Sequence, residues 1–175
     1  SENVALSGSL LPFMVMAILM AASGSYLDSA IVIVGAMVVG PEFGPIAGFC
    51  VAAVQRRREL ALRSFAALAV GFPLGITAVF LASLIFKWTG VTPDTFTEAD
   101  HGLSNIIANP GFFSFFVAFF AGVAGMLSLT TAKSGALVGV LISVTTIPAA
   151  ANIAVAAAYA DWPAWRGSQE QLAIN

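Results

Sequence analysis

The stretch GPEFGPIAG, residues 40–48, interrupts a long apolar run and places Glu42 between two prolines. Pro41 and Pro45 have no backbone N–H, and each disfavours a helical conformation in the glycine before it. We therefore expect helix continuity to fail between about residues 39 and 46. This break decides how the surrounding apolar run is interpreted.

The composition indicates an integral membrane protein. The chain has 175 residues, of which 59% are hydrophobic and 9% are charged, and its mean hydropathy is +0.94. Soluble domains are about 45–50% apolar and about 25% charged. Cys50 is the single cysteine, so neither an intrachain disulfide nor a cysteine-rich metal site can form.

Apolar runs long enough to cross a bilayer as helices, which takes about 20 residues, recur along the chain. We expect an all-α, polytopic transmembrane helical bundle that forms a single domain over residues 1–175. The sixth span would begin near Ser168 and be truncated by the end of the sequence. The five complete spans are Leu10–Tyr26, Ala30–Val54 with a break in its middle, Ser64–Phe86, Phe112–Thr131 and Gly135–Ala158.

Basic residues predict the orientation, because Lys and Arg are retained on the cytoplasmic side. The loop Arg56–Arg58 with Arg63 and Lys133 places five basic residues inside, against Lys87 and Arg166 outside. The connection Thr89–Pro110 is then outside. Every Tyr and Trp also falls at the outer side, where these residues favour headgroup depth: Tyr26, Trp88, Tyr159, Trp162 and Trp165.

The loops carry two local signals. HGLSNIIANPG, residues 101–111, predicts a short interfacial helix stopped by Pro110. Asp28 and Ser29 stand where the second span begins, and we expect them to cap its free N–H groups.

Two stretches suggest an internal repeat. VGAMVVGPEFGPIAG (34–48) aligns with VGVLISVTTIPAAAN (138–152), and each contains a helix-breaking proline, Pro45 in one and Pro148 in the other. Repeat one would cover about 10–88 and repeat two about 111–175. Units of three spans insert with opposite orientations, which gives the inverted repeat of many secondary transporters, with broken second and fifth helices. The alternative is that two Gly- and Ala-rich spans align through composition alone.

Glu42 is the thirteenth of the 25 residues in its span and would lie near the middle of the membrane. An ionisable residue there costs roughly 2.5–3.5 kcal/mol on insertion scales and is by default a candidate for ion or proton handling. The alternative is a hairpin that dips into the membrane, with Glu42 near an aqueous vestibule as a cap on the second half-helix.

The second copy supplies hydroxyl and amide groups instead of a charge. Its threonines either bind a ligand or bond back to backbone carbonyls that Pro148 frees. If the two breaks face each other, their half-helix N-termini would attract an anion. The predicted substrate- or ion-binding residues are Glu42, Gly40, Pro41, Gly44, Pro45, Thr145, Thr146, Pro148 and Asn152.

Other signals are weaker. GxxxG patterns such as Gly71–Gly75 favour intramolecular packing, although they also allow a homo-oligomer. His101 in a polar loop is typical of a solvated residue, and we expect no metal and no cofactor. No phosphate-binding loop follows a strand and no nucleophile has a His nearby, so we expect neither an enzyme nor a nucleic-acid-binding protein.

Three stretches carry a family resemblance: IVIVGAMVVGPEFGPIAG, FFAGVAGMLSLTTAKSGALVGVLISVTTIPAAAN and GSQEQLAIN. They resemble a family of hydrophobic bacterial and archaeal domains catalogued as domain of unknown function 389, over residues 23–175. The family pattern has an apolar residue where this chain has Glu42. The resemblance implies a multi-pass protein of the bacterial inner membrane, often with more chain on either side.

These observations favour a secondary transporter of a small polar or anionic solute, with a midplane site between two broken helices and a proton as a candidate coupling ion. The lipid bilayer and the solute would be its partners. The alternative is a non-transporting membrane scaffold or sensor module in which the breaks serve helix packing.

Overall fold

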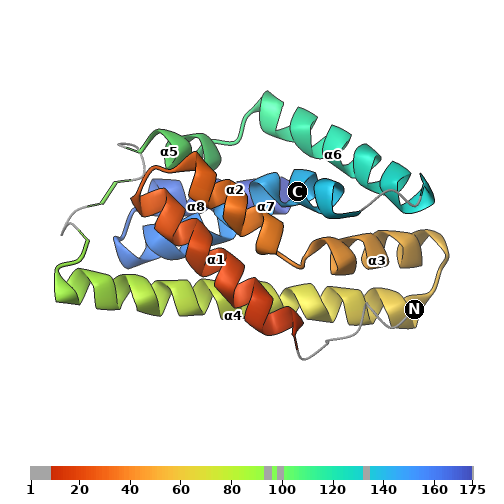
Figure 1. Ribbon diagram of the computed structural model, residues 1–175, viewed down its shortest axis with the longest axis horizontal. Helices are drawn as coiled ribbons and strands as arrows, with labels where there is room; N and C mark the ends of the chain where they lie inside the picture. The colour runs from red at the N-terminus through yellow and green to blue at the C-terminus, as the bar shows by residue number, and fades with distance from the viewer. Residues whose placement is uncertain (1–8, 93–95, 98–100, 132–134, 175) are drawn as a thin grey trace.

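A computed structural model describes residues 9–92, 96–97, 101–131 and 135–174, with the backbone alone for 128–131 and 135–145. The described residues form helices and no strands, which confirms the all-α prediction (Figure 1). The helices are α1 (Leu10–Tyr26), α2 (Ala30–Val39), α3 (Phe43–Val54), α4 (Arg58–Thr89), α5 (Gly102–Ala108), α6 (Phe112–Thr131), α7 (Gly135–Ala158) and α8 (Trp162–Ile174). The predicted bounds of α1, α6 and α7 are confirmed.

Helix α7 lies at the centre of the fold. Every residue from Thr146 to Ala156 is buried, and α1, α2, α4, α6 and α8 all contact this helix. A helix that packs on all sides needs apolar residues around its whole circumference. Its small side chains allow the neighbours to approach closely; they include Ala149, Ala150, Ala151, Ala154 and Ala156.

Glycines set the packing of α1 against its neighbours. A Cβ on Gly24 of α1 would lie 2.6 Å from Cγ1 of Ile33 in α2. Across the other contact, a Cβ on Gly71 of α4 would lie 2.9 Å from the sulfur of Met14 in α1. Gly75, one turn further along α4, receives Ile18 in the same way. The Gly71–Gly75 pattern therefore forms an intramolecular contact.

The predicted break in the second span is confirmed, but it is shorter than expected. Helix α2 ends at Val39, Gly40 is extended with φ −61° and ψ 125°, and α3 begins at Phe43 after a bend of 55°. The expectation that Gly44 carries irregular backbone was wrong, because Gly44 and Pro45 lie in α3. A proline is tolerated in the first turn of a helix, where its missing N–H would have no intrahelical acceptor.

The predicted break in the fifth span is wrong. Helix α7 runs from Gly135 to Ala158 with Pro148 inside it, as α4 runs through Pro73. A proline removes one backbone hydrogen bond, and neighbouring groups can satisfy the freed carbonyl. In α4 the carbonyl that Pro73 frees is that of Ala69, and the Thr77 hydroxyl donates to the carbonyl oxygen of Pro73 itself, four residues earlier, at 2.7 Å.

The other local predictions have mixed outcomes. The short helix before Pro110 is confirmed as α5, whereas the last helix begins at Trp162 and not near Ser168. Ser29 stands at the N-cap of α2 but makes no side-chain cap hydrogen bond. The Asp28 carboxylate instead accepts the backbone N–H of Leu103 at 3.1 Å, so it caps α5.

Membrane crossing is supported in part by helix length and composition. Among the described residues, α4 alone is long and apolar enough to cross a bilayer as a single helix. Two bent pairs qualify only if each is counted as one span: α2 with α3, and α5 with 112–127 of α6, bent by 81°. The crossing of the membrane by all five predicted spans stays a prediction.

We expect Gly24→Ala to lower the free energy of unfolding by about 1–3 kcal/mol, because overpacking forces α1 and α2 apart. Gly35→Ala, in the same hairpin, is the matched control, since a Cβ at Gly35 would meet no atom within 4 Å. Alanine favours helix over glycine, so this control should gain up to about 1 kcal/mol. Thermal unfolding in detergent measures both, and shifts of the same sign would contradict the packing described for Gly24.

Candidate functional site

The carboxyl group of Glu42 lies at the junction of α2 and α3 and is fully buried. Glu42 is the N-cap residue of α3, yet its side chain makes no cap hydrogen bond to that helix. Its Oε1 instead accepts a long hydrogen bond, 3.4 Å, from the Thr146 hydroxyl of α7. The carboxyl group therefore faces the central helix.

Gly40 provides the space for this carboxyl group. A Cβ on Gly40 would collide with Oε2 of Glu42, and the φ of Gly40, −61°, is one that any residue can adopt. Space, and not backbone freedom, is thus the reason for a glycine here. The carboxyl group folds back over the residue that ends α2.

The structure brings together part of the predicted site. Gly40, Glu42 and Thr146 are in contact through the carboxyl group. Pro45 and Pro148 are both fully buried, in α3 and in α7 respectively. The other predicted residues of the broken helix lie within three positions of Glu42 in the chain: Pro41, Gly44 and Pro45. The side chain of Thr145 lies outside the described residues.

Asn152 belongs to a different cluster. Its Oδ1 accepts from the Ser25 hydroxyl of α1 at 3.0 Å, and its Nδ2 donates to the backbone carbonyl of Ser104 in α5 at 3.2 Å. Asn152 is six residues beyond Thr146, which places it about 9 Å along α7 and about 120° around it. Its two hydrogen bonds join three helices outside the Glu42 site.

An aromatic cluster that the sequence reasoning missed lies beyond Asn152. The Phe96 ring stacks on His101 with centroids 4.2 Å apart and contacts Tyr26 and Tyr159 at 5.1 and 5.5 Å. The Tyr159 hydroxyl and Thr92 Oγ1 are 2.7 Å apart. Position in the sequence had indicated only interfacial aromatic residues and a solvated His101.

Gly40→Ala should lower the free energy of unfolding by about 1–3 kcal/mol, because the new methyl group displaces the Glu42 carboxyl group from a packed site. In the Glu42→Ala background the same change should cost close to nothing, since the colliding atoms are gone. A double-mutant cycle on thermal unfolding gives the coupling, expected at about 0.5 kcal/mol or more for groups in contact. Additive effects would show that Gly40 does not hold the carboxyl group.

Comparison with known proteins places the chain in a family. The family model described as a domain of unknown function (DUF389) matches residues 37–175, which include the helix break, Glu42, Thr146 and Asn152. A search of curated proteins and a search of solved structures found no match to the chain. The match covers well over half of the sequence, so the chain belongs to the DUF389 family.

Proposed function

We propose that the chain is a membrane-embedded secondary transporter of a small polar solute in which Glu42 takes up and releases the coupling proton. The observation that carries the proposal is the fully buried Glu42 carboxyl group at the helix break, facing Thr146. A carboxyl group inside a membrane is costly, and one that is found there marks an ion or proton pathway by default.

The distribution of apolar side chains supports a bilayer as the surroundings. Large apolar side chains on the outer faces of several helices are exposed, while the carboxyl group of Glu42 is buried. Soluble monomers rarely expose apolar patches beyond a few hundred Å². The exposed residues on α6 alone include Phe112, Phe113, Phe115, Phe116, Phe119 and Phe120.

The site geometry argues against a purely local role for Glu42. A capping role would direct the carboxylate to the N–H groups of α3, but no such hydrogen bond is made. The carboxyl group contacts Thr146, a residue 104 positions away on the helix around which the others pack. A change in the charge of Glu42 would therefore act on the contact between the broken helix and α7, which is what coupling to a conformational change requires.

The same geometry narrows the solute. A half-helix N-terminus attracts anions, but an ionised Glu42 carboxyl group, buried at the junction of α2 and α3, would repel an anionic solute that approaches the one at α3. This arrangement favours a neutral polar or cationic solute over an anionic one.

The inverted repeat stays a prediction, and its second break is lost because α7 is continuous. That continuity favours the second candidate, a non-transporting scaffold or sensor module.

We expect Glu42→Gln to abolish solute-dependent proton entry while preserving the fold, because the amide keeps the shape of the side chain and cannot carry the proton. Purified protein in liposomes, with a pH-sensitive dye inside and a panel of radiolabelled amino acids and sugars outside, measures both fluxes. Glu59→Gln is the matched control. Glu59 lies on α4, is 81% exposed and pairs with Arg63 at 2.6 Å.

Two outcomes would contradict the transport proposal. Proton entry that is unchanged in Glu42→Gln would remove the carboxyl group from the mechanism. The absence of any protein-dependent flux across the panel, with the protein shown to be folded, would favour the scaffold or sensor.

We further propose that the Arg56–Arg58 loop is cytoplasmic and that the connection Thr89–Pro110 is outside, in the bacterial inner membrane. Cys50 is replaced by serine, and Arg57→Cys and Thr97→Cys then each supply one thiol. A membrane-impermeant maleimide added to intact cells should label the second variant and not the first. The reverse labelling would overturn the orientation. Labelling of both variants would contradict the insertion of α4, which lies between the two positions, across the membrane.

A further inference from the structure

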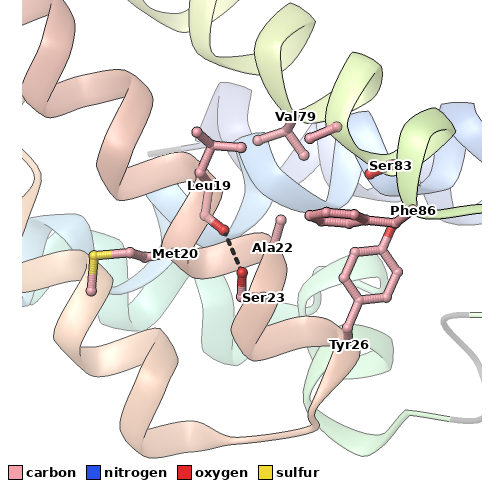
Figure 2. A pocket seen from close by; sticks show the side chains of 9 residues that line it. Leu19, Met20, Ala22, Ser23, Tyr26, Val79, Ser83 and Phe86 are labelled. Carbon is pink, nitrogen blue, oxygen red and sulfur yellow. Dashed lines mark hydrogen bonds between the residues drawn. The ribbon is translucent and has the colours of Figure 1, made fainter. Parts of the chain in front are cut away.

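A cavity of about 210 Å³ lies between α1 and α4, about one turn beyond the close contact that α1 makes at Gly75. Figure 2 shows it bounded by Leu19 and Val79 at one end and by Tyr26 and Phe86 at the other. The two helices carry small side chains along this part of their contact, and these leave the space unfilled: Ala22 and Ser23 of α1, and Ala82 and Ser83 of α4.

The cavity is apolar and opens to an apolar surface. Nine residues of the described chain line it, and none of them is charged. Met20 and Phe86 line the cavity and are also 38% and 36% exposed, so the opening lies beside them. On α4 the neighbouring Leu84 and Ile85 are exposed as well. An apolar cavity of about 150 Å³ stays dry and binds benzene, so this larger one has room for part of a hydrocarbon chain.

A buried hydroxyl group gives an independent indication of a ligand. Ser83 lines the cavity, is 1% exposed and has no hydrogen-bond partner among the described residues. By contrast, the Ser23 hydroxyl on the facing helix donates to the carbonyl oxygen of Leu19 at 3.0 Å (Figure 2). An unpaired buried hydroxyl is costly, so a ligand that brings an oxygen acceptor to Ser83 would be stabilised there.

The position of Ser83 along α4 narrows the ligand. Trp88 is 88% exposed, and tryptophan favours the depth of the lipid head groups. Ser83 precedes Trp88 by five residues, which is about 7–8 Å along the helix axis. Because the polar region on each side of a bilayer is about 5–8 Å deep, Ser83 lies near the boundary between head groups and hydrocarbon. The ester carbonyls of a glycerolipid lie at this boundary, since they join the acyl chains to the glycerol.

We propose that the cavity holds one ester-linked acyl chain of a membrane glycerolipid. The Ser83 hydroxyl donates to the ester carbonyl, and the chain extends into the space beside Leu19 and Val79. The site does not select the head group by charge, because no charged side chain lines it. The proposal rests on the membrane placement proposed above and is independent of transport.

Native mass spectrometry of the whole chain in detergent tests the proposal with three lipids that carry the same hydrocarbon chains. They are a diester phosphatidylcholine, its diether analogue, which lacks the ester carbonyls, and a diester phosphatidylglycerol. We expect one diester phosphatidylcholine to be retained about fivefold more than the diether, the effect of one hydrogen bond. The two diesters should be retained equally.

Ser83→Ala should lower the retention of both diesters to that of the diether. This variant should fold, because it removes a hydroxyl that has no partner among the described residues. Ala82→Leu, which narrows the cavity, should weaken the retention of all three lipids.

The matched control is Ser64→Ala, which should keep the preference for the diester. Ser64 is also buried on α4 without a hydrogen-bond partner among the described residues, but it lies about 28 Å along the helix from Ser83. Equal retention of diester and diether by the wild type would overturn the site, as would a preference that survives in Ser83→Ala or a preference for phosphatidylglycerol over phosphatidylcholine. Glu42→Gln should retain the diester normally, so failure of the transport proposal and failure of this one give different results.

Discussion

The burial of the Glu42 carboxyl group is the constraint on which the arrangement around it depends. A buried polar or charged group is costly unless other groups satisfy it. The chain meets this cost with an interrupted helix that turns the carboxyl group inward, a glycine that leaves room for it, and a threonine hydroxyl on α7. The extended backbone at Gly40 separates α2 from α3, and the two helices meet there at a bend of 55°.

Helix α7 connects this site to the rest of the molecule. It presents Thr146 to the broken helix and, about 9 Å along its axis, Asn152 to α1 and α5. Because every residue of α7 from Thr146 to Ala156 is buried, a movement that opens Glu42 to water has to shift α7 against its neighbours or move α2 and α3 away from it. Packed interiors change between discrete arrangements and do not deform continuously. Such a change would therefore also alter the hydrogen bonds that Asn152 of α7 makes with α1 and α5.

The sequence was informative wherever a local cause dominates. Apolar runs bounded by turn residues define α1, α6 and α7, and the Gly40-Pro41 pair predicts the break because the residue before a proline avoids the helical conformation. Local reasoning failed at Pro148, where a proline lies inside a helix, in the segment from Thr146 to Ala156 that is buried throughout. It also failed for Asn152 and Asp28, whose partners lie 127, 48 and 75 positions away in the chain. Such pairings depend on the tertiary fold and leave no periodic signal.

The central claim is that Glu42 changes its protonation state inside the folded protein, and infrared difference spectroscopy across pH tests it most directly. The account predicts a carboxylic-acid C=O band that appears and disappears reversibly with pH in the wild type. It also predicts that this band is absent from Glu42→Gln and retained in Glu59→Gln. A wild-type spectrum without any band that depends on Glu42, at any pH at which the protein stays folded, would contradict it.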